Sequence, residues 1–351
     1  MKKLALLFLV LLVAAAGVAG WWFYSAVDRP FKGYEAAEQF VEIPSGSGSV
    51  TIAKRLAESG VVHDVNSFRL ALWITGAGRR LQAGEYRFDH AMSPRQVADK
   101  LARGDVYVHP ITFPEGLTIR QMAALYESKG FGEAKAFTAA ASNGELVQDI
   151  DPQARDLEGY LFPETYTLPR RATAEQLIAR MVAGFRKALT PDIQAAATAR
   201  GLTVRQLVTL ASIVEKETGN KDERPLVAAV YSNRLQIGMG LQCDPTVIYA
   251  LERAGRYDGN LRREDLQFDS PYNTYRYAGL PPGPIASPGR ASLQAAASPA
   301  SVSYIYFVSK NDGSHAFATT LDEHNRNVQQ YQIKYFRERR AASRSGAQRR
   351  P

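Results

Sequence analysis

The sequence predicts an α+β protein with a single transmembrane helix at its N-terminus. Three observations support this fold class. Residues 4–24 form an uncharged and almost wholly apolar run. Short strand and helix patterns then follow in the order β-α-α-β over residues 40–88. From residue 156 onward, short apolar helices alternate with loops rich in Pro, Gly, Tyr and Asn, and a β-rich run lies at 303–308. Such a mixture is typical of α+β domains.

The composition describes a globular chain whose folded part carries no excess of positive charge. The 351 residues are 45% hydrophobic, which is enough for two or three domains with cores of their own. The formal net charge is +8, but Lys2, Lys3 and the segment from Lys334 to the end supply all of it. Residues 4–333 are therefore formally neutral, which argues against a nucleic-acid partner. Cys243 is the single cysteine, so no intramolecular disulfide forms, and we interpret it as a packed thiol rather than a nucleophile.

The apolar run Leu4–Tyr24 is just longer than the about 20 residues that a helix needs to cross a bilayer. Lys2 and Lys3 precede it, so the positive-inside rule keeps the N-terminus in the cytoplasm and sends the rest of the chain outward. A cleavable signal peptide is the alternative, but its apolar region is usually only about 7–15 residues long. The aromatic residues 21–23 favour an interfacial belt instead. We therefore predict an uncleaved anchor at 1–27 and a linker at 28–38.

Residues 39–110 are predicted to form a small module followed by one further helix. The expected elements are a strand at 40–43, helices at about 52–60 and 66–74, and a returning strand at 84–88. Ser93 before Pro94 marks the next helix, because serine caps helix N-termini and proline fits the first turn. This order resembles LysM, a small βααβ domain that binds glycans built on N-acetylglucosamine. A purely structural spacer is an equal alternative, since only the element order carries the resemblance.

The region 111–332 is predicted to be a larger α+β domain. Helices are expected at 174–187, 191–200, 203–217 and 223–236, and the run 303–308 is expected to pair with 316–319 across a turn. The residues after this domain, 333–351, are basic and lack apolar periodicity. We interpret them as a disordered tail.

The helix expected at 203–217 ends in two carboxylates, Glu215 and Glu217. On a helical wheel Glu215 falls within the apolar face and Glu217 on its border, while Arg205, Thr209 and Ser212 lie on the opposite face. Two residues apart, the carboxylates point in different directions and cannot act as a close pair. Both lie where the helix dipole opposes ionisation, so either is a candidate general acid with a raised pKa. The wheel does not choose between them, and it also allows both to be solvated. Glu215 would need a buried partner such as an arginine.

Four loops near this helix combine aromatic and polar side chains, as sugar-binding surfaces do. They span residues 157–166, 241–247, 271–275 and 279–285. Each loop alone also fits a structural turn. Their concentration in one domain favours a carbohydrate site.

The motifs LASIVEKET, LQCDPTVIYA, PYNTY and GLPPGPI, in this order, resemble the YceG-like (MltG) family of endolytic peptidoglycan transglycosylases. In that family the second acid of the EKE run is the catalytic acid/base, which is Glu217 in this sequence. Cys243 departs from the Ser or Thr that the family pattern leads us to expect before Asp-Pro-Thr-Val. The resemblance implies further substrate-binding positions: Glu158, Tyr160, Glu164, Gln242, Asp244, Asn273 and Tyr275.

The reaction implied by this resemblance is cleavage within peptidoglycan strands, between N-acetylmuramic acid and N-acetylglucosamine. The C6 hydroxyl of the sugar attacks its own C1, which gives a 1,6-anhydro end and uses no water. Hydrolases usually need two carboxylates about 5–10 Å apart, whereas here one carboxyl suffices because the nucleophile is intramolecular. The resemblance also implies no cofactor, an anchor in the inner membrane, a periplasmic catalytic domain, and peptidoglycan synthases as candidate partners in terminating nascent strands.

Two other classes of protein remain to be weighed against this interpretation. A metalloenzyme is disfavoured, because the five histidines show no HExxH or other close ligand spacing and thus imply no metal site. A non-catalytic glycan-binding scaffold is the better rival, since an anchor and a LysM-like module would be sufficient for it. The two hypotheses differ in whether the glycan strand is cut.

Overall fold

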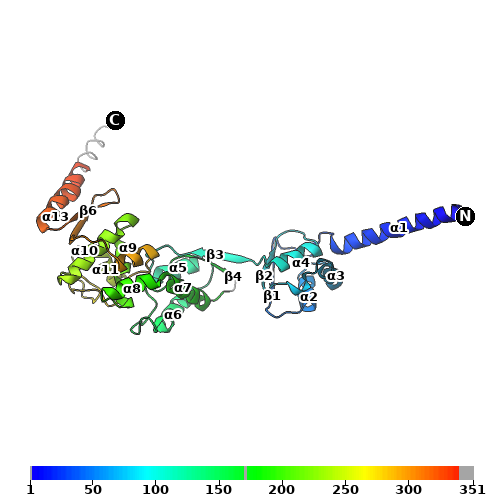
Figure 1. Ribbon diagram of the computed structural model, residues 1–351, viewed down its shortest axis with the longest axis horizontal. Helices are drawn as coiled ribbons and strands as arrows, with labels where there is room; N and C mark the ends of the chain where they lie inside the picture. The colour runs from blue at the N-terminus through cyan, green and yellow to red at the C-terminus, as the bar shows by residue number, and fades with distance from the viewer. Residues whose placement is uncertain (1, 170–171, 340–351) are drawn as a thin grey trace, which may run out of the picture. The chain divides into compact units, whose positions relative to one another are not determined.

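The computed structural model describes residues 2–169 and 172–339 (Figure 1). Contacts divide the chain into two compact units, residues 1–110 with 167–171 and residues 111–166 with 172–351. Within the described ranges the strands form three two-stranded sheets, and helices make up most of the remaining regular structure. This arrangement confirms the predicted mixed α+β class.

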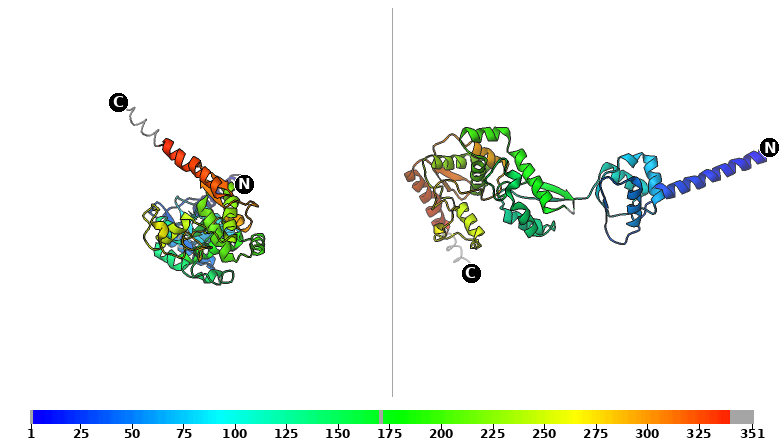
Figure 2. Two further views of the ribbon diagram at one scale, coloured as in Figure 1. Left: turned by 90° about the vertical axis from the view of Figure 1, so that its left-hand side faces the viewer. Right: turned by 90° about the horizontal axis from the view of Figure 1, so that it is seen from below.

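The first unit begins with the apolar helix α1 (Lys2–Val27), which projects from the unit (Figure 2). Its segment Phe8–Val27 has a mean hydropathy of 1.8, and residues 8–24 are exposed. It is long and apolar enough to cross a membrane. The end of α1 packs on the module that follows: Val27 is fully buried, and Asp28 pairs with Arg95 at 2.8 Å.

The predicted β-α-α-β order is confirmed in this unit. Strands β1 and β2 pair antiparallel, with Val41 opposite Tyr86, and both helices pack their apolar faces into a shared core. Ser93 and Gln96 form the capping box expected at the start of the next helix. The elements are β1 (Gln39–Ile43), α2 (Ser49–Glu58), α3 (Val65–Thr75), the 3-10 helix η1 (Ala77–Arg79), β2 (Gly84–Phe88) and α4 (Pro94–Arg103).

The segment 28–38, expected to be a linker, is bonded to this module. Phe31 pairs with Met92, and the amide of Gly33 donates to the carbonyl of Gly60 at 2.8 Å. Gly60 has φ +69°, and a Cβ there would lie 2.7 Å from the backbone of Gly33. Glycine therefore both ends α2 and permits this close approach.

The second unit is mainly helical. The boundary between the units runs through strands β3 (Val108–Thr112) and β4 (Thr165–Pro169), which form one of the sheets. The other elements are α5 (Ile119–Ser128), α6 (Ala134–Ala141), η2 (Gly144–Val147), α7 (Ala174–Ala188), α8 (Pro191–Ala199), α9 (Val204–Glu217), η3 (Lys221–Glu223), α10 (Arg224–Gln236), α11 (Asp244–Arg253), η4 (Asp265–Gln267), α12 (Arg290–Ala297), β5 (Tyr306–Ser309), β6 (His315–Ala318), α13 (Leu321–Val328) and the π-helix η5 (Gln329–Lys334).

The hairpin expected near the end of this unit is present, but its first strand is shorter than predicted. β5 pairs antiparallel with β6, with Phe307 opposite Phe317. The amide of Ile305 still donates to the carbonyl of Ala318 at 3.0 Å, but the carbonyls before β5 accept hydrogen bonds from side chains of α10. Asn233 donates to the carbonyls of Val302 and Tyr304, and Arg234 donates to that of Ile305.

The predicted disordered tail differs from the structure in its first residues. Residues 329–334 are π-helical and residues 335–339 are helical. Lys334 and Glu338 approach each other to 4.0 Å one turn apart, and the rings of Tyr335 and Phe336 are in contact. Such pairs favour a continued helix. The remainder of the predicted tail, residues 340–351, lies outside the described residues.

Helix α9 lies at the centre of the second unit and packs against α8, α10, α11 and α12. All its side chains from Leu207 to Val214 are buried. The wheel was wrong to place Thr209 and Ser212 on a polar face, because the loop before α12 covers that face. Ser212 donates to the carbonyl of Thr209 at 2.7 Å and accepts from the amide of Ile285 at 3.1 Å.

Candidate active site

The candidate catalytic acid, Glu217, is the last residue of α9. The helix begins at a capping box in which Thr203 and Gln206 satisfy each other's backbone amides. Packing on four neighbouring helices then fixes its direction, so its C-terminal turn has a defined position. The unsatisfied carbonyls of this turn carry partial negative charge, which disfavours a second negative charge on Glu217.

Two donors from other elements hold one oxygen of the Glu217 carboxyl. The hydroxyl of Tyr231, on α10, donates to Oε1 at 2.8 Å. The thiol of Cys243, directly before α11, donates to the same oxygen at 3.0 Å. Both donor side chains are buried, whereas Glu217 is half-buried. Because Oε1 accepts both bonds, the second oxygen, Oε2, is left to carry the acidic proton.

The surroundings of Glu217 favour its protonated form. Burial is the largest influence and raises the pKa of the carboxyl. The bonds from Cys243 and Tyr231 oppose this effect, the negative charge of Asp244 adds to it, and His315 lowers the pKa. Desolvation outweighs the donors and raises the pKa of Glu217, which is the direction of shift that favours a general acid.

Glu215 has a different role. Its Oε1 lies 2.6 Å from Nη2 of Arg224, and its Oε2 accepts from the amide of Gly289 at 2.9 Å. The Glu215 and Arg224 side chains are only 5% and 4% exposed. Arg224 also pairs with Glu115 at 3.1 Å. This confirms the inference that Glu215 would require a buried arginine. Through these contacts the Glu215 carboxylate links α9 to α10 and to the start of α12.

The loops 241–247 and 271–275 lie beside Glu217. The hydroxyl of Tyr275 donates to Asp244 at 2.6 Å. The charge of Asp244 raises the pKa of Glu217, and the charge of Glu217 contributes to the raised pKa of Tyr275. Gln242 is exposed and has φ +50°, a conformation that side-chain-bearing residues adopt at a cost. The loops are joined because the amide of Gln242 donates to the carbonyl of Thr274 at 3.2 Å.

Asn273 is buried beneath the loop 271–275 and does not face the space around Glu217. It is fully buried, and its amide group donates to the carbonyls of Leu266 and Phe268 at 3.0 and 2.8 Å. Its side-chain oxygen accepts from the amide of Tyr275 at 3.0 Å. These bonds fix the loop that presents Tyr275.

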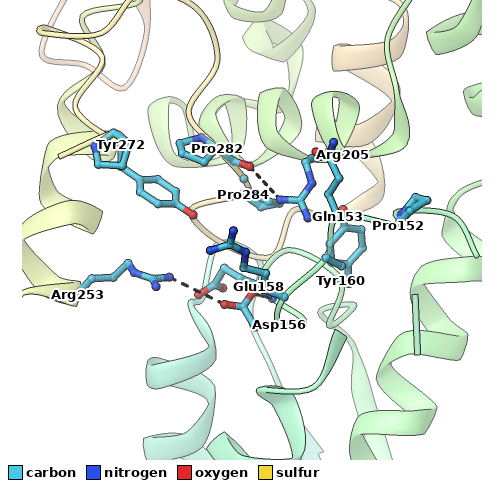
Figure 3. A pocket seen from close by; sticks show the side chains of 14 residues that line it. Pro152, Gln153, Asp156, Glu158, Tyr160, Arg205, Arg253, Tyr272, Pro282 and Pro284 are labelled. Carbon is cyan, nitrogen blue, oxygen red and sulfur yellow. Dashed lines mark hydrogen bonds and ion pairs between the residues drawn. The ribbon is translucent and has the colours of Figure 1, made fainter. Parts of the chain in front are cut away.

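Glu158 and Tyr160 lie at the other end of α9. They line a cavity of about 670 Å³ together with Arg205, from the first turn of α9, and Arg253, the last residue of α11 (Figure 3). Along a helix axis, Arg205 and Glu217 are separated by about 18 Å at 1.5 Å per residue. The structure therefore divides the predicted binding residues into two groups.

Within this cavity both predicted residues have buried partners. Glu158 accepts from the amide of Ile119 at 3.1 Å and from the hydroxyl of Tyr249 at 3.2 Å. Burial nevertheless dominates and raises the pKa of Glu158 to about 8. Tyr160 donates to the buried carboxylate of Asp151 at 2.5 Å.

Glu164 belongs to neither group. It is exposed, and its backbone carbonyl accepts from the amide of Phe113 at 3.0 Å just before β4. Its side chain makes no hydrogen bond or ion pair to any residue in the described part of the chain. The structure thus shows a strand-pairing role for its backbone.

Sequence reasoning missed several residues around the acid. Tyr231 lies within a helix with no motif that marks it, and Cys243 was interpreted as a packed thiol. His315 was considered only among the histidines that lack metal-ligand spacing, and its Nδ1 lies 2.7 Å from Oε2 of Glu223, close enough to Glu217 to influence its pKa. The only available signal was the position of Cys243 directly before the Asp-Pro-Thr-Val motif. In residues 2–169 and 172–339, no three His, Cys, Asp or Glu side chains gather as a metal site would require.

The chain is similar to a described family and to named relatives. Residues 41–330 match the model of the YceG-like family. The endolytic murein transglycosylase of Bacillus subtilis (strain 168) is 33% identical, over 83% of this chain and 84% of the relative. The endolytic murein transglycosylase of Streptococcus pneumoniae serotype 2 is 30% identical, over 93% of this chain but 64% of the longer relative.

A solved structure is also similar. The crystal structure of a YceG-like protein from Listeria monocytogenes superimposes with a TM-score of 0.56 at 32% identity, covering 82% of this chain and 98% of that chain. The family match extends through the βααβ module, the helix that carries Glu217 and the loops around it. This chain belongs to the YceG-like family.

Proposed function

We propose that this protein is an endolytic murein transglycosylase with Glu217 as its catalytic acid and base. It cleaves the bond between N-acetylmuramic acid and N-acetylglucosamine within peptidoglycan strands and produces 1,6-anhydro ends. Family membership and the named activity of relatives support the reaction class. The observation that carries the assignment is the single desolvated carboxyl at the end of α9, held by Tyr231 and Cys243 through one oxygen.

The proton on Oε2 of Glu217 supplies the first step. It passes to the glycosidic oxygen as the bond from C1 of the muramic acid to that oxygen breaks, so the leaving sugar departs as a neutral alcohol. The C6 hydroxyl of the same muramic acid bonds to C1 and gives its proton to Glu217. The acid is restored and no water is consumed.

One carboxyl is sufficient for this sequence of steps, because the nucleophile is tethered to the carbon that it attacks. Glu215 cannot supply a second carboxylate without breaking its buried pair with Arg224. Asp244 is engaged by Tyr275, and its charge raises the pKa of Glu217. This arrangement favours an intramolecular mechanism over a hydrolase with two working carboxylates.

The test is mass spectrometry of peptidoglycan digested with the purified protein and with its Glu217→Gln variant. We expect anhydro ends from the unmodified protein and a loss of at least about 10³-fold in rate from the variant, because the amide cannot donate or take the proton. Reducing ends would instead indicate a hydrolase, with Asp244 the residue to examine as base. Absence of cleavage by the unmodified protein would favour the scaffold.

The location of the enzyme follows from α1. We infer that α1 spans the inner membrane with its N-terminus in the cytoplasm and with the catalytic unit in the periplasm, since Lys2 and Lys3 precede the apolar segment. Protease added to intact spheroplasts should degrade the catalytic unit. Protection of that unit until the membrane is lysed would contradict this orientation.

The βααβ module is proposed to be a LysM-like glycan-binding domain. Its element order and its inclusion in the family match support this role. Addition of an N-acetylglucosamine oligomer to the Glu217→Gln protein should shift backbone NMR signals of residues 39–88. Shifts confined to the catalytic unit would leave the module as a spacer.

Peptidoglycan synthases are the proposed protein partners, because an enzyme that ends nascent strands must meet them where they are made. Crosslinking in intact membranes followed by purification of this chain should recover a synthase. Failure to recover one from cells that make peptidoglycan actively would contradict the partnership.

A further inference from the structure

We propose that the cavity at the N-terminal end of α9 binds a carboxylate of the peptide stem carried by the glycan strand. This inference rests on the proposed function, because it takes peptidoglycan as the substrate. Four segments form the cavity: the loop around 152–160, the first turn of α9, the end of α11 and the loop around 271–284. Its volume of about 670 Å³ lies in the range of small-ligand sites.

Charged and aromatic side chains enter the cavity from two sides. Figure 3 shows Arg253 and Tyr272 on one side, Arg205 and Tyr160 on the other, and Glu158 between them. The remaining lining includes four prolines, which restrict the backbone of the loops, and the charged residues Arg155 and Asp156. The site is therefore formed in advance of any ligand.

Arg253 is positioned to bind an anion. Its Nη1 donates to the hydroxyl of Tyr249 at 3.1 Å, and its guanidinium lies 5.7 and 5.6 Å from the ring centres of Tyr249 and Tyr272. The side chain is 53% exposed, and its carboxylate partner in the described structure, Asp156, is 4.0 Å away. A guanidinium that is held in orientation but keeps free N–H groups is suited to bidentate binding of a carboxylate.

Arg205 differs from Arg253 because each of its three guanidinium nitrogens already has a protein partner. Its Nε and Nη2 donate to the buried carboxylate of Asp151 at 3.1 and 2.9 Å, and its Nη1 donates to the carbonyl of Pro282 at 2.9 Å. It shapes the wall of the cavity. Ligand binding therefore depends on Arg253, with exposed Arg155 nearby.

The charge of the cavity also favours an anion. Burial raises the pKa of Glu158 to about 8, so this carboxyl is mostly neutral at pH 7. Asp156 is then the one charged acid in the lining, against Arg155, Arg205 and Arg253. The buried carboxylate of Asp151 neutralises Arg205. Arg155 and Arg253 then face a single charged acid, Asp156, so the lining keeps an excess of positive charge.

The cavity lies within reach of a stem attached at the catalytic acid. α9 runs from Arg205 in the cavity to Glu217, and α11 runs back from beside Glu217 to Arg253. These helices span about 18 and 14 Å. A peptide of about five residues extends to roughly 17 Å. The stem of a muramic acid bound at Glu217 can therefore place a carboxylate on Arg253, and the tether raises its effective concentration there.

The experiment compares cleavage of strands that carry peptide stems with cleavage of strands from which an amidase has removed them. For the Arg253→Ala variant we expect the ratio of kcat/KM on stem-bearing strands to kcat/KM on stripped strands to fall by about 10-fold, mainly through KM. The matched control is Arg263→Ala, which removes the same charge from an exposed residue outside the cavity and should keep the ratio of the unmodified protein. The Arg253→Lys variant, which keeps the charge, should give an intermediate ratio.

Direct binding supplies an independent measurement. A synthetic muramoyl pentapeptide should bind the Glu217→Gln protein in calorimetry and lose that binding when Arg253→Ala is added, with the thermal transition retained. An unchanged ratio, or peptide binding that survives Arg253→Ala, would overturn the inference. If the unmodified protein cuts neither kind of strand, the proposed function fails, and peptide binding still decides the role of the cavity.

Discussion

At the scale of single residues, one oxygen of Glu217 accepts hydrogen bonds from Tyr231 on α10 and from Cys243 before α11, while the second oxygen accepts none from the described residues. This asymmetry matters because the position of the proton determines which oxygen can reach the substrate. Tyr231 and Cys243 act as positioning residues through Glu217. They also moderate the effect of burial, because each bond lowers the pKa of the carboxyl.

Cys243 provides a test of this balance. Cys243→Ala removes a donor that favours the ionised carboxyl, so the pKa of Glu217 should rise and activity should persist to higher pH, by about 0.5–1 unit. Cys243→Ser supplies a stronger donor and should move the same limb of the kcat/KM profile to lower pH. The measurement is the pH dependence of strand cleavage. Shifts of equal sign in both variants would contradict the assigned role of the thiol.

Glu158 couples the stability of the second unit to pH. Its pKa rises from an ordinary value near 4.5 to about 8 in the folded protein, so the folded state binds a proton that the unfolded state releases. This contribution is fully present below about pH 4.5 and is lost as pH rises through about 8. In the unmodified protein, the free energy of unfolding should decline by about 4–5 kcal/mol between these pH limits, and Glu158→Gln should remove this decline. Denaturant unfolding at several pH values measures it, and parallel profiles for the two proteins would refute it.

The two acids of the EKE run show how far residue patterns predict a site. Helical spacing was enough to conclude that Glu215 and Glu217 diverge, and that Glu215 needs a buried cation. It could not identify Arg224, because that residue lies on another helix and only packing brings the two within 2.6 Å. The motif resemblance was required to choose Glu217.

At the scale of elements, α9 is buried along its whole middle section rather than on one face. The wheel assigned a polar face because Thr209 and Ser212 are short hydroxyl residues. Such residues are compatible with burial when a backbone group is available, as the amide of Ile285 is for Ser212. Sequence periodicity therefore predicted the helix but not its surroundings.

The burial of α9 predicts a clear difference between two substitutions in it. Leu210→Ala should lower the free energy of unfolding by about 2–5 kcal/mol, because Leu210 is fully buried and a cavity would remain. Thr203→Ala removes the cap hydrogen bond and should cost about 1 kcal/mol. Urea unfolding followed by far-UV circular dichroism compares them. Similar losses for both would show that α9 is not the centre of the core.

At the scale of the whole molecule, α1 combines two structural properties. Its apolar length is suited to a membrane, and its last turn is part of the folded module through Val27 and the neighbouring Asp28–Arg95 pair. Val27 and Asp28 both follow Gly20, so these contacts remain whether or not the chain is cut there. They show that the module begins within the last turn of α1.

Two truncations separate the apolar segment of α1 from its packed end. Removal of residues 1–24 should release the protein from membranes and leave the stability of the first unit unchanged. Removal of residues 1–28 should lower the free energy of unfolding of the first unit by about 1.5–3 kcal/mol, because the burial of Val27 is lost along with the Asp28–Arg95 ion pair. Thermal unfolding measures the difference. If cells that express the full-length chain yield a soluble product that has been cut near Gly20, this result would instead support a signal peptide.

The sequence by itself predicted an N-terminal helix long and apolar enough to cross a membrane, the βααβ order, most helices of the second unit and the divergence of the two acids. These features depend on residues close together in the chain, where a period of 3.6 or 2, a cap or a glycine is sufficient. Only the tertiary structure decided that Tyr231 and Cys243 hold Glu217, and that Glu158 and Tyr160 lie in a separate cavity with Arg253. The physical reason is that the pKa and access of a carboxyl depend on which distant segments exclude water from it, and no local pattern specifies them.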